Sequence, residues 1–160
     1  MKRHALTALT LLAAVTIATQ AGAHCQIPCG IYDDELRVQL IEEHITTVEK
    51  SMQQIVALGA ADSIDYNQLV RWVNNKEEHA QKIQDIVTDY FMAQRIKPSV
   101  NHEDEKAMNE YMHKLAILHA IQIHAMKAKQ STDLEQIEML RKMTTMFREA
   151  YFGEEAAHKH

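Results

Sequence analysis

The sequence predicts an all-α protein: an antiparallel four-helix bundle, preceded by a short N-terminal hook that carries metal-binding groups (residues 24–32). Three observations predict it. The 160 residues include only two prolines and four glycines, so little interrupts the long stretches between them. Apolar residues recur at spacings of three and four, which is the period of a helix with one buried face. Strand-like alternation is absent over any useful length.

The first helix is expected to begin at Asp33 or Asp34, either of which can cap it, and to run to about Leu58. Gly59 is expected to end it as a helix C-cap. Its apolar positions form one stripe suited to burial: Leu36, Leu40, Ile41, Ile45, Val48, Met52, Ile55 and Val56.

The second helix is expected to start at Asp65 and to run to about Met92, with Pro98 marking the break that follows. Its apolar positions keep a similar period: Leu69, Trp72, Val73, Ile83, Ile86, Val87 and Tyr90. These positions predict a second amphipathic helix that packs on the first.

The third and fourth helices complete the bundle (about residues 33–152). Asn101 is expected to cap the third, which extends to about Lys129, and the acidic residues after Asn101 complement the positive end of the helix dipole. Ser131 or Thr132 is expected to cap the fourth, which ends near Phe152. Because the connections are short, consecutive helices should be antiparallel neighbours.

Residues 1–23 have the pattern of a cleaved secretory signal peptide. Lys2 and Arg3 precede an apolar run from Ala5 to Ala18, and Ala21-Gly22-Ala23 offers the small residues that a signal peptidase needs. The run is shorter than the roughly 20 residues that span a bilayer, which favours cleavage after Ala23 over an uncleaved anchor. We expect an exported protein, most plausibly in a bacterial periplasm, with no membrane attachment after cleavage.

The mature chain, residues 24–160, has the length of one domain. The formal charge of the whole sequence is −5, and loss of Lys2 and Arg3 makes it about −7. Nucleic acid is an improbable partner for such an acidic chain, because phosphate binding depends on clustered Lys and Arg. The net charge also repels small anions, so a site for an anion must attract it with local charges.

The hook gathers metal ligands within a few residues. Cleavage after Ala23 would make His24 the N-terminus, which places a free amine and an imidazole beside Cys25 and Cys29. Gly30, like Pro28, favours a tight loop. The amine, the Cys25 amide and the two thiolates can lie near one plane, with the imidazole as an axial ligand. Planar nitrogen and sulfur donors suit nickel or copper better than tetrahedral zinc.

Two simpler interpretations compete with an enzyme. Two cysteines in an oxidising compartment usually form a disulfide, so Cys25 and Cys29 could staple a non-enzymatic bundle. The same hook could also serve a periplasmic copper or nickel carrier that binds metal without turnover. A structural staple has no need of a histidine at the processed terminus, which favours a metal site.

Residues 24–32 (HCQIPCGIY) resemble the nickel-hook motif H-C-x-x-P-C-G-x-Y of nickel-dependent superoxide dismutase. The match includes both cysteines, the proline, the glycine, the tyrosine and the exposure of the histidine by processing. The stretch from Thr88 to Phe91 also resembles a D-Y-F segment in the second helix of that family. The likeness therefore extends over essentially the whole mature chain.

The resemblance implies one nickel ion per subunit, cycling between its divalent and trivalent states to convert superoxide to dioxygen and hydrogen peroxide. His24, Cys25 and Cys29 would hold the ion, and Tyr32 would order the anion or water beside it. The family forms hexamers, which implies a homo-oligomer here.

Two glutamines depart from the family pattern. Gln26 stands where family members often have Asp, and Gln39 stands where the family has a glutamate that steadies the axial imidazole. The arginine that assists that glutamate aligns near Asn75. Gln39 can still accept the imidazole N–H without the negative charge, so we expect altered nickel redox behaviour with activity retained.

Other clusters of potential ligands are better explained as structure. Met139, Met143 and Met146 share a helical face typical of core packing. The sequence Glu77-Glu78-His79 resembles part of a di-metal motif, but only residues 110–113 have the Glu-x-x-His spacing that such sites need on two helices. The three histidines of the third helix lack the spacing of four that would pair them: His113, His119 and His124.

Overall fold

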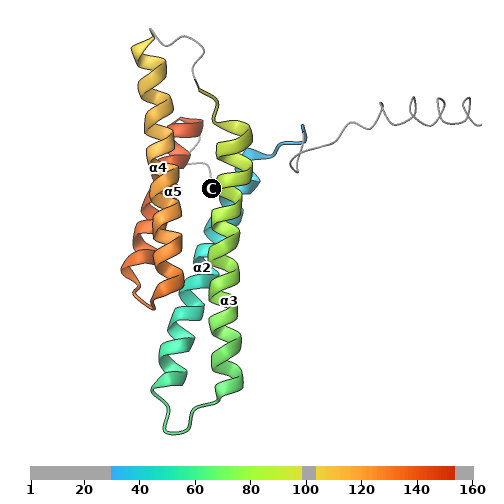
Figure 1. Cartoon of the computed structure of the whole chain (residues 1–160), viewed down its shortest axis with the longest axis vertical. Helices are drawn as coiled ribbons and strands as arrows, with labels where there is room; N and C mark the ends of the chain where they lie inside the picture. Colours follow the sequence, from blue (N-terminus) through green and yellow to red (C-terminus); the bar gives the residue numbers. More distant parts are fainter. Residues whose placement is uncertain (1–29, 99–103, 154–160) are drawn as a thin grey trace, which may run out of the picture. The chain divides into compact units, whose positions relative to one another are not determined.

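The computed structural model describes residues 30–98 and 104–153, and within these ranges the chain is helical (Figure 1). The elements are α2 (Asp34–Gly59), α3 (Tyr66–Asp85), the π-helix η1 (Ile86–Arg95), α4 (Glu105–Gln130) and α5 (Glu135–Phe152). Because η1 continues α3 without a break, the described chain forms four helical rods. The predicted signal peptide (residues 1–23) and the predicted hook as far as Cys29 lie outside the described residues.

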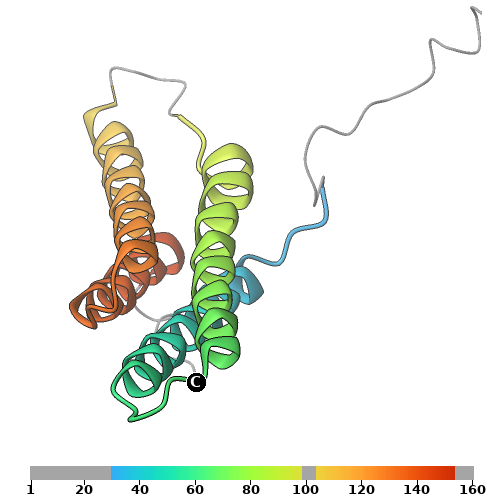
Figure 2. The ribbon, with the colours of Figure 1, turned by 60° about the horizontal axis from the view of Figure 1, so that its bottom comes forward.

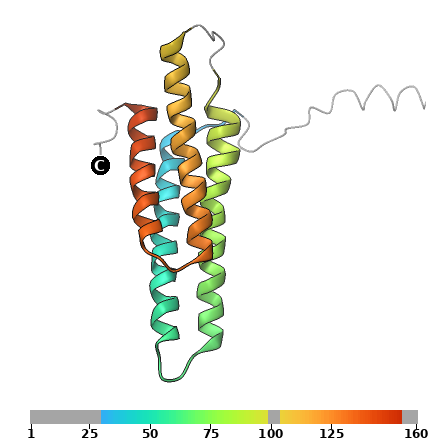
Figure 3. The ribbon, with the colours of Figure 1, turned by 60° about the vertical axis from the view of Figure 1, so that its left-hand side comes forward.

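Consecutive helices run antiparallel, as predicted. Contacts join α2 to α3, α3 to α4, α4 to α5 and α5 back to α2, and the α2–α3 and α4–α5 pairs lie side by side (Figures 1 and 2). Figure 3 shows the α2–α3 and α4–α5 connections toward the same end of the bundle. Short connections force this up-and-down order, which closes one core between the four rods.

The core consists of the inward faces of the four rods. Side chains from every helix are completely buried there, including Ile41, Ile45, Ile83, Leu118 and Leu140. At one end the core is aromatic: the Phe91 ring stands edge-on to Phe147, with ring centroids 4.8 Å apart. The predicted stripes therefore face inward, although their outermost members, such as Val56, remain exposed.

Aspartates cap the first three helices. The carboxylates of Asp33, Asp65 and Asp104 each accept a backbone N–H three residues ahead, from Leu36, Gln68 and Ala107, at 3.0 Å. The Asp65 cap was predicted, and Asp33 is one of the two residues that were predicted for the first cap. The third helix begins at Glu105 rather than after Asn101, which lies outside the described residues, because Asp104 supplies the capping oxygen.

The predicted helix ends need two corrections. Gly59 is the last residue of α2, and the cap is Ala60 with an ordinary φ of −92°. The Ala60 N–H donates to the Val56 carbonyl at 3.1 Å, so no left-handed residue is needed. Neither Ser131 nor Thr132 caps α5. The Asp133 carboxylate accepts the Glu135 N–H at 3.0 Å, and the helix starts there.

Ion pairs join the outer edges of α2 and α5. Arg148, only 4% exposed, donates to Glu42 at 3.1 Å and to Glu35, and Arg141 donates to Glu49 at 2.7 Å. Their order along the two helices fixes the antiparallel register. Among the described helices, none combines the length and apolar character that a membrane span requires.

Candidate active site

The π-helix η1 positions the side chains of the site. Its wide turn places residues that are five apart in the sequence on the same face of the helix. An α-helix closes its hydrogen bonds at i+4, whereas here the Ile96 N–H donates to the Phe91 carbonyl at 2.8 Å, the i+5 pattern of a π-helix. Tyr90 and Arg95 are five residues apart, and both reach Asp34 in the first turn of α2. The wider helical turn is therefore what lets both side chains share one carboxylate.

Asp34 is the centre of a hydrogen-bonded group that we call the Asp34 cluster (Asp34, Tyr90, Arg95 and Tyr151). The Tyr90 hydroxyl donates to Oδ1 at 2.6 Å, and the Tyr151 hydroxyl donates to Oδ2 at 2.7 Å. The Arg95 guanidinium donates through Nε to Oδ1 at 2.8 Å and through Nη2 to Oδ2 at 2.7 Å. One carboxylate thus ties together α2, η1 and α5.

The protonation states of the Asp34 cluster are set by these bonds. Burial favours the neutral acid at Asp34, but the hydrogen bonds from Arg95, Tyr90 and Tyr151 outweigh it and hold the pKa of Asp34 below its usual value. Burial, together with the bonded Asp34 carboxylate, raises the pKa of Tyr90 and of Tyr151 to about 12. At neutral pH both phenols therefore keep their protons and act as donors to a charged carboxylate.

Tyr32, the last hook residue, lies against the Asp34 cluster. Its ring stands edge-on to Tyr90, with centroids 5.9 Å apart, and the Arg95 guanidinium carbon lies 4.4 Å from the centroid of the Tyr32 ring. The side chain remains 42% exposed. The ring is thus held by two partners while solvent still reaches the residue. Two residues before it, Gly30 has a φ of +83°, a left-handed conformation that glycine adopts without strain.

A second arginine adjoins the Asp34 cluster. The guanidinium carbon of Arg37 lies 5.0 Å from the centroid of the Tyr90 ring. Its Nε is buried and has no hydrogen-bond partner within the described part of the chain. A buried donor of this kind is normally satisfied, so Arg37 offers an unused N–H beside Tyr90.

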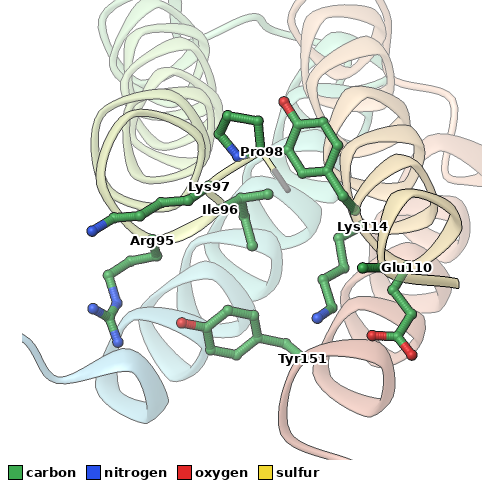
Figure 4. A pocket seen from close by; sticks show the side chains of 9 residues that line it. Arg95, Ile96, Lys97, Pro98, Glu110, Lys114 and Tyr151 are labelled. Atoms are coloured by element: carbon green, nitrogen blue, oxygen red, sulfur yellow. The ribbon is translucent and has the colours of Figure 1, made fainter. Parts of the chain in front are cut away.

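A pocket of about 450 Å³ adjoins the Asp34 cluster and shares Arg95 and Tyr151 with it (Figure 4). In Figure 4 the Lys114 side chain of α4 extends toward Tyr151 of α5, whose hydroxyl points to the side on which Arg95 lies. Lys97 also lines the pocket, and Glu110 is its one acidic residue. Three cations against one carboxylate make this pocket, here called the cationic pocket, locally positive in an acidic chain.

The sequence-predicted site residues divide into two groups. His24, Cys25, Gln26 and Cys29 lie outside the described residues, whereas Tyr32 and Gln39 lie within them. Gln39 is exposed in the second turn of α2, and its amide Nε2 donates to Glu35 at 3.2 Å.

Asn75, where the alignment places the family arginine, donates instead to Ser51 at 2.9 Å, about five helical turns beyond Asp34 along α2. The arginines beside Tyr32 and Tyr90 are Arg95 and Arg37. Neither arginine was predicted from the sequence, nor were Tyr151 and the role of Asp34 as a hydrogen-bonding centre. The hook motif pointed to this region through Tyr32, and the D-Y-F segment pointed to it through Tyr90.

A comparison with known families identifies the family of the chain. The family model described as nickel-containing superoxide dismutase matches residues 19–155. The chain belongs to this family. It is therefore a nickel superoxide dismutase, an oxidoreductase whose substrate is superoxide and whose metal is nickel. No curated protein and no solved structure matches the chain.

The donors available to nickel fit this assignment. In the described ranges no three His, Cys, Asp or Glu side chains are arranged to hold a metal ion. The Asp34 carboxylate already accepts hydrogen bonds on both oxygens. The hook sequence, in contrast, carries an imidazole and two thiols, the soft and borderline donors that nickel takes. The hook sequence is therefore the part of the chain whose donors suit nickel.

Proposed function

We propose that this superoxide dismutase holds one nickel ion per subunit in its N-terminal hook. The His24 amine and imidazole, the Cys25 amide and thiolate, and the Cys29 thiolate would be the ligands. Nickel bound there supplies reversible exchange of one electron with superoxide, giving dioxygen in one half of the cycle and hydrogen peroxide in the other. The observation that carries the proposal is the sequence of residues 24–32 in a chain of this family.

Tyr32 would order the substrate anion or a water molecule beside the hook. Its ring is fixed by Arg95 on one face and Tyr90 at its edge, and both partners are fixed in turn by Asp34. This support keeps the phenol in one orientation without closing it off from solvent, since the residue is 42% exposed. The Asp34 cluster therefore acts as a positioning device for Tyr32.

The cationic pocket would attract superoxide locally, although the net charge of the protein is negative. Superoxide is an anion, and the formal charge of −5 repels it at long range. Arg95, Lys97 and Lys114 place positive charge at the bundle end that carries Tyr32. Lys97 is exposed, so its charge reaches solvent directly.

Gln39 would accept the second N–H of the His24 imidazole. Its Nε2 donates to Glu35, which leaves the amide oxygen as the acceptor that an imidazole N–H needs. A neutral amide makes the bonded imidazole a weaker donor to metal than a carboxylate would. Gln26 would add no charge at the third hook position, where family members often have Asp.

We further propose that the enzyme is exported to a bacterial periplasm, processed after Ala23 and assembled into a homo-oligomer, a hexamer by resemblance to the family. The apolar surface of α3 supports assembly, because Tyr66, Val70 and Val73 are 70%, 56% and 37% exposed. Their spacing of four and three residues puts them on one helical face. Native mass spectrometry of the processed protein measures the subunit number directly.

One insertion tests the hook most sharply. An alanine placed between Ala23 and His24, with processing before it, moves the free amine one residue away from the ligand set. We expect nickel content and superoxide turnover each to fall at least about tenfold. The matched control adds one alanine after His160. Full turnover by the N-terminal insertion variant would overturn the proposed ligands, and retained metal binding without any turnover in the unmodified protein would favour a carrier.

A further inference from the structure

A pair of histidines joins α2 to α3, and neither belongs to the Asp34 cluster or lines the cationic pocket. Nδ1 of His44 lies 3.1 Å from Nδ1 of His79, and the two rings stand edge-on with centroids 4.9 Å apart. Both side chains are partly buried and still accessible to solvent. The two nitrogens that face each other are both capable of binding a metal ion.

On each of the two helices the histidine follows two glutamates. The sequence Glu42-Glu43-His44 on α2 and the sequence Glu77-Glu78-His79 on the antiparallel α3 meet at their histidines. In each triplet the first glutamate pairs with a buried cation: Glu42 with Arg148 at 3.1 Å, and Glu77 with Lys76 at 3.1 Å. The second glutamates, Glu43 and Glu78, remain as the acidic groups that act on both histidines.

We propose that His44 and His79 form a binding site for a divalent late transition metal ion, nickel to zinc in chemical class, separate from the hook. The Nδ1 atoms would be the two fixed ligands, and the carboxylate of Glu43 or Glu78, with water, would complete the coordination. Glu78 is 64% exposed and held only by Lys82 one turn away, so its side chain is free to turn toward the pair.

The distance between the two nitrogens suits a shared metal ion. At the usual metal–nitrogen distance of about 2.0–2.1 Å, nitrogens 3.1 Å apart subtend an angle of about 100° at the metal. That angle lies between the octahedral and tetrahedral values. A pair joined only by one N–H···N hydrogen bond has the same separation, so the alternative is a purely structural contact between neutral imidazoles.

The charges around the pair suit a cation. Burial is the main cause that lowers the pKa of His44 and of His79, and Lys82 lowers both further. Neutral imidazole is the form that coordinates metal. Glu43 and Glu78 supply the negative charge that a divalent cation needs. Two fixed ligands make an open site, so we expect weaker binding than at a closed site with four.

The experiment adds zinc to the processed protein after nickel has filled the hook. Long-range proton–nitrogen NMR of the histidine rings should show His44 and His79 changing together as zinc is added, with Nδ1 the coordinated nitrogen in both. His119, exposed on α4, should not change. This measurement needs no substitution and is independent of whether the variants fold.

Calorimetric titration with zinc compares the unmodified protein with variants that lack one histidine. His44→Gln and His79→Gln should each weaken zinc binding at least about tenfold, whereas His119→Gln should bind as the unmodified protein does. The midpoint of thermal unfolding should rise with zinc only where both histidines are present. Zinc binding unaffected by either substitution, or unchanged His44 and His79 resonances at saturating zinc, would overturn the site and leave a hydrogen-bonded pair. Neither result depends on dismutase activity, so the hook proposal is tested separately.

Discussion

At the scale of single residues, Asp34 has the largest structural role near the site. It accepts hydrogen bonds from Tyr90, Arg95 and Tyr151, whose own positions in the chain are 56, 61 and 117 residues away. Its side chain is 16% exposed and that of Arg95 is 29% exposed, so the pair is only partly screened by water. Removal of the carboxylate charge would leave Arg95 without its partner and release the ring of Tyr32.

Asp34→Asn should therefore lower the free energy of unfolding by roughly 2–3 kcal/mol at pH 7. Because the folded pKa of Asp34 lies below the unfolded value, its contribution is present above that unfolded value and is lost as pH falls through the folded pKa. The difference between the two proteins should therefore shrink in strong acid. Urea unfolding at pH 7 and pH 3 checks this, with Asp62→Asn, exposed in the α2–α3 connection, as control. A difference that persists unchanged at low pH would contradict it.

Gln39→Glu tests the residue that replaces the family glutamate. A carboxylate should make the His24 imidazole a stronger donor and lower the nickel reduction potential, with turnover retained. It also places a second negative charge beside Glu35, four residues away, which should cost about 0.5 kcal/mol of stability. Voltammetry and turnover of both proteins provide the readout. An unchanged potential would count against any contact between Gln39 and the nickel site.

Only some of the individual site residues could be predicted from the sequence. Tyr32 follows from the hook motif, and Tyr90 from the D-Y-F segment. Asp34 was seen only as a possible helix cap. Arg95 and Tyr151 were not seen at all, because contacts between residues so far apart in the chain leave no periodic signal. Histidine spacing along one helix likewise gave no hint that His44 meets His79 across two helices.

At the scale of elements, the predicted helices exist and their ends moved by a few residues. Periodicity identifies the buried face of a helix, but capping depends on which side chain reaches a free N–H, as Asp104 does for α4. The π-helical winding of η1 could not be predicted from the sequence, because its apolar pattern also suits an α-helix. That winding is what brings Tyr90 and Arg95 to one carboxylate.

Lys76 shows how one helix stabilises the end of another. Its side chain is 5% exposed, and the ammonium donates to the Ala128 carbonyl at 2.8 Å and to the Lys129 carbonyl, at the C-terminus of α4. These carbonyls have no partner within their own helix. A cation at this end also opposes the negative end of the helix dipole.

Lys76→Met should keep the buried volume and lose these bonds, which we expect to lower the free energy of unfolding by about 2 kcal/mol. Lys127→Met, at an exposed position in the last turn of α4, should change it by less than about 0.5 kcal/mol. Chemical denaturation of the two variants checks both values. Equal stabilities for the two would show that Lys76 does not cap α4 in solution.

At the scale of the whole molecule, the bundle is a scaffold that presents Tyr32 and the cationic pocket at one end. The antiparallel order follows from short connections and was predicted, and so was the single core. The positive charge near Tyr32 was not predicted, because its three residues come from separate parts of the chain. Arg95 lies in η1, Lys97 in the segment after it and Lys114 in α4. An acidic chain can thus attract an anion locally while its net charge is negative.

The central claim is that processing after Ala23 creates a nickel site at His24. The most direct measurement takes the protein from its export compartment and determines its N-terminal residue and bound metal by mass spectrometry, with superoxide removal assayed on the same sample. We expect His24 at the N-terminus, one nickel per subunit and rapid turnover. A disulfide between Cys25 and Cys29, with neither nickel nor activity after anaerobic reduction and nickel loading, would contradict it.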